Sequence, residues 1–193
     1  MAVIFDVNLL SKKIIDIKLV EKILYDYGIT INSARSIDDW TWNNERQIRM
    51  QESIKEEIDK GKIIILKLES RRFVETELYI ERMDKEFLYN LWFNTEGYPQ
   101  LDNDAINEEN RIYYEKAYQG ILRIANEERD YVKIAGIGIE TDFYYCENEE
   151  DILQNSKNIT AWILNDGINM ERGLSQYKQK KINGTNKIVF EKV

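Results

Sequence analysis

Three strand-like segments follow one another between residues 62 and 94, and they constrain the fold more than any other part of the chain. Residues 62–68 are almost continuously aliphatic, which is typical of a strand covered on both faces. Residues 72–82 alternate between apolar and polar side chains, and residues 87–94 are rich in aromatic ones. Because only a short polar turn separates the last two segments, the pattern predicts an antiparallel meander.

Three further segments have the apolar spacing of a helix that buries one face. The first, residues 17–27, is preceded by Asp16 as a candidate N-cap and followed by Gly28 as a candidate stop. The second, residues 44–60, carries only a narrow apolar stripe and ends at a glycine. The third and longest covers residues 104–126.

The remaining segments predict more strands and one short helical turn, at about residues 149–154. On the longest helix, Tyr114 and Tyr118 lie one turn apart, and we expect them to form an exposed pair. Asn183-Gly184 is typical of a hairpin turn before the last strand. The further strands are expected at residues 2–10, 131–139, 142–146, 159–165 and 187–193.

Together these elements predict an α+β fold in a single domain that spans residues 1–193. We expect a largely antiparallel sheet of about six to eight strands, with about three main helices packed on it. One proline and nine glycines leave little material for a flexible linker between domains.

Smaller features lead to local predictions. Gly136 and Gly138 within a strand indicate a bulge or a close approach of another segment. Cys146 is expected to be a small core residue, because only acidic residues follow it and a reactive thiolate needs a cation nearby. Residues 75–79 and 140–144 are similar, either through duplication of a strand pair or by chance.

The residue types present exclude several kinds of chemistry. The chain has no histidine and one cysteine, so it cannot assemble a Ser-His-Asp triad, a Cys-His pair or a zinc site of those ligands. No nucleotide-binding glycine motif occurs. We therefore expect no catalytic, cofactor-binding or metal-binding residues. A carboxylate-based or Mg²⁺- or Mn²⁺-dependent enzyme remains the alternative, with Glu75, Glu77 and Glu81 on one strand face and Phe73 and Tyr79 beside them.

Net charge indicates the kind of partner. The chain has 35 acidic and 27 basic residues and a net charge of −8. Residues 102–151 hold fourteen acidic residues and five basic ones. Such a segment favours a basic protein partner and disfavours nucleic acids and anionic membranes; alternatively, the acidic residues only solvate the surface. Nothing in the sequence indicates an oligomeric state.

The N-terminal segment and the apolar runs predict a cytoplasmic protein. Asp6 interrupts the first apolar run too early for a signal peptide, and no run reaches the roughly 18 apolar residues of a membrane helix. A single cysteine is consistent with a reducing compartment. Richness in Ile, Lys, Asn, Tyr and Glu is typical of bacterial proteins encoded by AT-rich DNA.

Two segments are candidates for binding a partner. Residues 38–42 combine acidic residues with two tryptophans, and residues 147–151 are densely acidic. Trp40 and Trp42 lie in a polar stretch, where strand or helix burial explains them less easily. Alternatively, one Trp covers the edge of the core and the other packs on the next helix, while residues 147–151 are a solvated loop and helix start. The predicted partner-binding residues are Asp38, Asp39, Trp40, Trp42, Glu147, Glu149, Glu150 and Asp151.

In small size, acidic charge, lack of catalytic residue types and supply of aromatic residues, the chain resembles the immunity proteins of bacterial toxin systems, which neutralise a toxin by binding it. The resemblance is one of general character and rests on no motif. It implies a non-enzymatic inhibitor whose acidic surface faces a basic toxin. A subunit or scaffold of an assembly is a further alternative.

Overall fold

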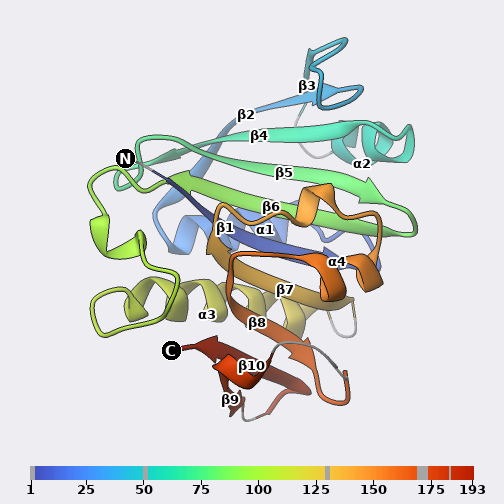
Figure 1. The fold of residues 1–193 in the computed structure, drawn as a ribbon. Helices are drawn as coiled ribbons and strands as arrows, with labels where there is room; N and C mark the ends of the chain where they lie inside the picture. Colours follow the sequence, from blue (N-terminus) through green and yellow to red (C-terminus); the bar gives the residue numbers. More distant parts are fainter. Residues whose placement is uncertain (1–2, 50–51, 129–130, 169–173, 183) are drawn as a thin grey trace.

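The computed structural model describes residues 3–49, 52–128, 131–168, 174–182 and 184–193. These residues form one antiparallel ten-stranded sheet in the order β3-β2-β4-β5-β6-β1-β7-β8-β10-β9, with four α-helices (Figure 1). The strands are β1 (Ile4–Ser11), β2 (Ile29–Ile37), β3 (Arg46–Ile48), β4 (Ile63–Ser70), β5 (Thr76–Met83), β6 (Glu86–Asn94), β7 (Val132–Ile139), β8 (Ile159–Asn165), β9 (Tyr177–Lys181) and β10 (Lys187–Lys192). The helices are α1 (Ile17–Asp26), α2 (Glu52–Asp59), α3 (Arg111–Glu127) and α4 (Glu149–Asn155). Three short 3₁₀ turns are η1 (Pro99–Leu101), η2 (Phe143–Tyr145) and η3 (Leu174–Gln176).

The predicted meander is present as β4, β5 and β6. Ile80 of β5 lies opposite Ile64 of β4 on one side and Tyr89 of β6 on the other. The first strand of the chain, β1, then inserts between β6 and β7, so that Phe5 lies opposite Phe93 and Ile139. The N-terminal strand therefore joins the two halves of the sheet.

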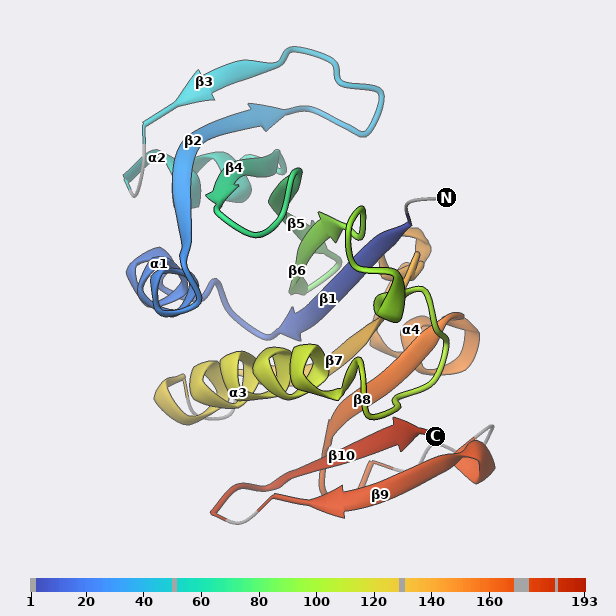
Figure 2. The same cartoon turned by 90° about the vertical axis from the view of Figure 1, so that its left-hand side faces the viewer.

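Three helices cover one face of the sheet, called the back face here, as Figure 2 shows for α1 and α3. Ile23 of α1, Ile54 of α2 and Ile121 of α3 are buried in one core with the strands. Helix α1 begins and ends as predicted: the Asp16 side chain accepts from the Lys18 backbone N–H at 3.0 Å, and Gly28 has a positive φ of 74°.

The opposite face, called the front face, is covered over β7 and β8 by η2 and α4. Phe143 of η2 packs on Trp162 of β8, with ring centroids 5.6 Å apart. The two glycines of β7 allow this packing: a Cβ on Gly136 would lie 2.4 Å from the Phe143 ring, and one on Gly138 would lie 2.0 Å from the Asn158 carbonyl oxygen. The predicted close approach at these glycines is confirmed.

The sheet has ten strands rather than the predicted six to eight, and there are four helices rather than three. The strands that the sequence did not indicate are β2, which lies next to β3, and β3 and β9, at the two ends of the sheet. β3 is three residues long, and β9 reads Tyr-Lys-Gln-Lys-Lys with four exposed positions. Neither has an apolar face, so neither shows the alternation by which half-buried strands are recognised.

The helix predicted at residues 44–60 is shorter than expected. Residues 46–48 form β3 instead, opposite Ser36 and its neighbours on β2, and α2 begins at Glu52. Arg46 reaches Glu57 of that helix at 2.9 Å. Pairing with β2 therefore overrides local helix propensity in this segment.

The longest helix also starts later than predicted, at Arg111. Asn107 and Asn110 stop it from extending upstream, because their side-chain oxygens accept from the backbone N–H groups of residues 107, 109 and 110. Tyr114 and Tyr118 are 0% and 5% exposed, so the predicted exposed pair is wrong. The Tyr114 ring packs edge-on against Phe5 at 5.2 Å, which places the aromatic side of α3 against the sheet.

The strand predicted at residues 142–146 is the turn η2, in which the backbone N–H of Cys146 bonds to the Phe143 carbonyl. Residues 75–79 belong mostly to β5, whereas residues 140–144 form a turn, so the two similar segments adopt different conformations. Asn183 of the predicted hairpin lies outside the described residues, while β9 and β10 pair as an antiparallel ladder around it.

Candidate functional site

Aromatic side chains form a continuous row across the front face. Successive ring centroids are 6.1 Å apart for Trp92 and Tyr79, 5.2 Å for Tyr79 and Trp40, 6.4 Å for Trp40 and Tyr144, and 4.3 Å for Tyr144 and Tyr145. Together with Trp42, these six residues are called the aromatic face below. Four of them are exposed: Trp40 by 37%, Trp42 by 41%, Tyr144 by 40% and Tyr145 by 77%.

The row is assembled from segments far apart in the sequence. Tyr79 and Trp92 project from β5 and β6, whereas Trp40 lies in the loop after β2 and Tyr144 lies in η2. The contact between Trp40 and Tyr144 brings the first predicted partner-binding segment close to the second, since Tyr144 is only three residues from Glu147.

The two aspartates of the first segment organise the loop that carries the tryptophans. Asp38 pairs with Lys62 and also accepts from Asn44 at 2.7 Å. Asp39 accepts from the side chain and the backbone N–H of Thr41. The hydrogen bond from Lys62 lowers the pKa of Asp38, and the bond from Thr41 lowers that of Asp39. Both carboxylates are therefore engaged by other residues of the chain, although the Asp39 side chain is exposed.

Arg35 of β2 reaches across β4 to the acidic side chains of the aromatic face. Its guanidinium donates to Glu77 at 2.9 Å and to Glu45 at 3.1 Å, and it lies 4.9 Å from the Trp42 ring. The Tyr79 hydroxyl donates to the other oxygen of Glu77 at 2.9 Å. This network fixes the positions of Trp42 and Tyr79 relative to one another.

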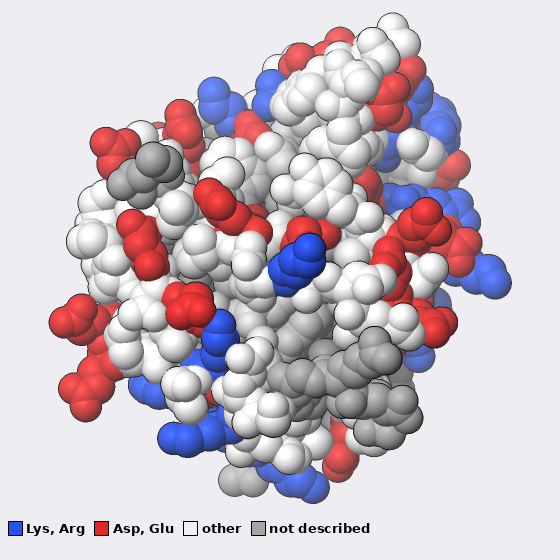
Figure 3. All heavy atoms as spheres, in the orientation of Figure 1, with Lys and Arg blue, Asp and Glu red and all other residues white. Residues whose placement is uncertain are grey.

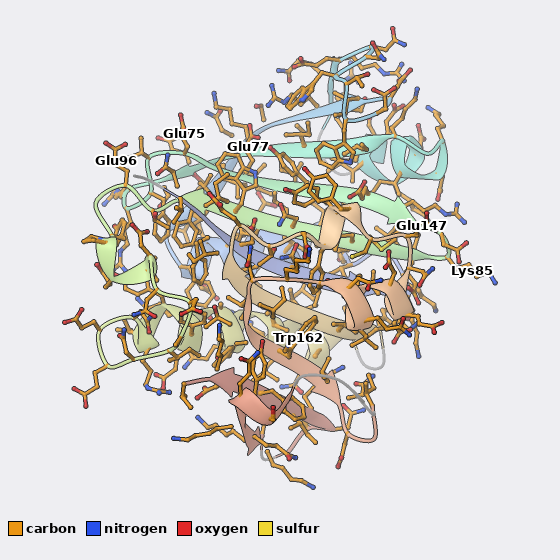
Figure 4. All side chains as sticks on the ribbon, in the orientation of Figure 1. Glu75, Glu77, Lys85, Glu96, Glu147 and Trp162 are labelled. Atoms are coloured by element: carbon orange, nitrogen blue, oxygen red, sulfur yellow. The ribbon has the colours of Figure 1, made fainter. Side chains whose placement is uncertain are left out.

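The predicted row of glutamates is only partly present. Glu77, Tyr79 and Glu81 share the front face, but Glu75 precedes β5 (Figure 4). Phe73 was expected beside them and instead stacks on Phe93 in the back core, with ring centroids 3.8 Å apart. Residues before Thr76 are not part of β5, so strand alternation does not decide the direction of the Phe73 side chain. Burial in the apolar core behind the sheet removes the Phe73 ring from water.

Glu81 has an unusual environment beneath Trp40. The indole N–H of Trp40 donates to its carboxylate at 3.1 Å. Burial raises the pKa of Glu81 from 4.5 to about 7, against the opposing effect of that hydrogen bond. The Trp40 ring is thus held in place by a carboxyl group that changes its protonation near neutral pH.

A buried polar network anchors the turn that carries Tyr144. Asp6 accepts from the Asn90 amide at 3.1 Å and from the Thr141 backbone N–H at 2.8 Å. Asn8 donates to the Thr141 hydroxyl at 2.6 Å and accepts from Asn90 at 2.9 Å. Burial raises the pKa of Asp6 to about 6, although the hydrogen bonds oppose the shift. Nothing in the sequence indicates this network, because single polar residues in strands are usually exposed.

The acidic residues of the second predicted segment divide into two kinds. Glu149 pairs with Lys133, and Asp151 accepts from the Glu147 backbone N–H at 2.8 Å and from Asn155 at 2.5 Å. Glu147 and Glu150 have exposed side chains, and Glu150 accepts from the neighbouring Gln154 at 3.0 Å. Figure 4 places Glu147 at the right-hand edge of the front face.

The surface view agrees with this arrangement. In Figure 3, uncharged side chains fill much of the upper part of the front face, and acidic and basic side chains border them. An uncharged centre that contains exposed aromatic rings, with a charged rim, is typical of a protein interface.

Other kinds of site receive little support from the described residues. Within them, no group of three or more Cys, Asp or Glu residues is arranged to hold a metal ion. Burial raises the pKa of the Cys146 thiol, which makes it a weaker nucleophile at neutral pH. No described helix has both the length and the apolar character needed to cross a membrane.

A comparison with protein-family models finds no match for this chain, and comparisons with curated proteins and with solved structures find none either. A functional assignment therefore depends on the chemistry of the aromatic face.

Proposed function

We propose that this chain is a non-enzymatic protein-binding protein that docks its aromatic face onto a basic protein, as an immunity-type inhibitor docks onto a toxin. The observation that carries the proposal is the contact of exposed aromatic rings from two distant segments, Trp40 and Tyr144. The exposed acidic residues Glu147 and Glu150 follow shortly after Tyr144 in the chain. Aromatic anchors at the centre of a patch supply most of the binding energy in many protein interfaces.

The internal contacts of the aromatic face support this role. Trp40 is held by Glu81 and Tyr79, and Trp42 lies against Arg35. Rings that are already fixed lose little conformational entropy when a partner covers them, so more of the contact energy appears as affinity. Exposed rings with no such restraints would be a weaker argument for binding.

The exposed acidic side chains indicate which kind of partner the aromatic face would bind. Glu147 and Glu150 have exposed side chains shortly after Tyr145 in the chain, whereas Asp38 is paired with Lys62 and Asp39 bonds to Thr41. Acidic groups at a rim accelerate association with a basic partner and repel an acidic one. The proposed partner is therefore a protein with a basic surface.

The test begins with affinity capture from the native cells at low salt, using the tagged chain and two variants. The double variant Trp40→Ala/Tyr145→Ala should lose the partner, with affinity at least about 100-fold weaker. Tyr25→Ala is the matched control, because Tyr25 is 70% exposed but lies on α1 behind the sheet. Equal capture by all three proteins would contradict the proposal.

A second measurement tests the inhibitory role and the charge. Expression of the captured partner alone should stop growth, and co-expression with the native chain should restore it. Glu147→Lys/Glu150→Lys should slow association by about tenfold at low salt, with a smaller effect at high salt. Reversal of Glu149 and Asp151 is avoided, because it would break the Lys133 pair and the start of α4.

A further inference from the structure

A large apolar cavity lies behind the sheet, on the side opposite the aromatic face. It has a volume of about 590 Å³ and is bounded by α1, α3 and the back face of the central strands. Figure 2 shows α1 and α3 on the same side of the sheet. Its walls include Val20, Leu24, Phe5, Leu91 and Ile124. Cavities of about 300–1,000 Å³ with mostly apolar walls are typical small-molecule sites.

Small residues on α3 contribute to the space. Ala117 and Gly120 both line the cavity, one turn apart on the helix. A Cβ on Gly120 would meet the Tyr27 ring of α1 at 3.6 Å, which is an ordinary contact distance. A large side chain at Ala117 would project into the cavity, so the position offers a way to fill it.

Basic residues gather where the cavity reaches the surface. Arg71 and Arg72 have exposed side chains in the loop between β4 and β5, and Lys116 of α3 is half-buried. Within the described part of the chain, none of these three forms an ion pair. The acidic residue at the rim, Asp26, is already paired with Arg123. The opening therefore has an unbalanced positive charge, although the chain as a whole is acidic.

We propose that this cavity binds a long-chain fatty acid, with the alkyl chain between α1, α3 and the sheet and the carboxylate at Arg71, Arg72 and Lys116. An alkyl chain gains free energy by leaving water for apolar walls, and guanidinium groups bind carboxylates with two parallel hydrogen bonds. The site is separate from the aromatic face and does not depend on the protein-binding role.

Calorimetric titration of the full chain with hexadecanoate, below its micelle concentration, tests the proposal. We expect one molecule bound per chain, with a dissociation constant on the order of micromolar, and a higher melting temperature in its presence. Two ligands with the same alkyl chain serve as controls: hexadecanol is uncharged, and hexadecyltrimethylammonium is a cation. We expect hexadecyltrimethylammonium to bind at least about tenfold more weakly than hexadecanoate. Absence of hexadecanoate binding, or equal binding of the cation, would overturn the proposal.

Two variants locate the binding. Ala117→Phe should abolish hexadecanoate binding, and Ile112→Phe, on the exposed side of the same helix, should leave it unchanged. Arg71→Glu/Arg72→Glu should weaken hexadecanoate binding by about tenfold or more without changing that of hexadecanol. Lys85→Glu, at the tip of the β5–β6 hairpin, is the charge control (Figure 4). If Ala117→Phe does not fold, the arginine variant alone decides: unchanged hexadecanoate affinity would refute the assigned site.

Discussion

The two faces of the central strands differ in almost every respect, although they alternate residue by residue along the same chain. On β5, Leu78 and Ile80 point into the back core, while Tyr79 and Glu81 belong to the front. The back face combines a buried apolar core with a cavity, and the front face combines exposed aromatic rings with titratable groups. A single sheet therefore carries two chemically independent surfaces, and substitutions should act on one without disturbing the other.

The largest expected effect is at the glycines of the front face. Gly138→Ala would place a methyl group 2.0 Å from the Asn158 carbonyl oxygen, so the backbone of β7 or of the segment just before β8 must move. We expect a loss of about 4 kcal/mol in the free energy of unfolding, measured by urea denaturation. A loss under about 1 kcal/mol would mean that the two segments do not approach so closely.

Removal of the central amide in the buried network should have the next largest effect. Asn90→Ala removes one hydrogen bond from each of the buried residues Asp6 and Asn8, which keep only their bonds to Thr141 among those described above. We expect a loss of about 3 kcal/mol, because two buried polar groups lose a partner. Asn126→Ala, at an exposed position of α3, should change stability by less than about 0.5 kcal/mol. Similar values for the two variants would show that the network does not stabilise the front face.

Glu81 makes the stability of the front face depend on pH. Its pKa is raised from 4.5 to about 7 in the folded protein, so the folded state holds the proton more tightly than the unfolded chain does. The stabilisation is fully present below pH 4.5 and is lost as the pH rises through about 7. Glu81→Gln cannot ionise and can still accept from Trp40.

We therefore expect Glu81→Gln to be more stable than the native chain by about 2 kcal/mol at a pH of about 8, and equally stable at a pH of about 4. Denaturant titrations at the two pH values measure this difference. Glu75→Gln, at an exposed position, should show no such dependence. A constant difference between Glu81→Gln and the native chain across this pH range would rule out the raised pKa.

The smallest effect, and the one of opposite sign to the first, is expected on the back face. Gly120→Ala meets Tyr27 and Ile23 only at 3.6 Å and beyond, and alanine favours the helical conformation. Stability should rise by about 0.5–1 kcal/mol in the same urea experiment. Destabilisation by this variant would mean that α1 and α3 pack more tightly than the structure indicates. The back face would then resemble the front face in having no room for an added methyl group at its glycine.

Strong local patterns made much of the fold predictable. The aliphatic run in β4, the alternation in β5 and the capping residues around α1 each reflect a physical preference that acts over a few residues. β3 and the region before α3 were missed because their conformation depends on partners elsewhere: β3 on the pairing of Ala34 with Ile48, and the start of α3 on the side chains of Asn107 and Asn110.

The candidate site was predictable to a lesser extent. The sequence singled out Trp40 and Trp42 because aromatic residues in a polar loop are unusual, and both have exposed rings. It could not indicate that Tyr144 lies against Trp40, because more than one hundred residues separate them. Nor could it indicate that Asp38 and Asp39 are occupied by Lys62 and Thr41, since the same residues in another loop would face solvent.

The lysines of β9 have a consequence for the behaviour of the whole molecule at high concentration. A strand at the end of a sheet has free backbone groups that can pair with another copy of the chain and begin a fibril. Lys178, Lys180 and Lys181 would bring like charges together in such a pairing, and β3, at the other end, is only three residues long. Both ends of the sheet therefore oppose growth into an aggregate. The positive charge of the β9 lysines lies at an edge where self-association would otherwise begin.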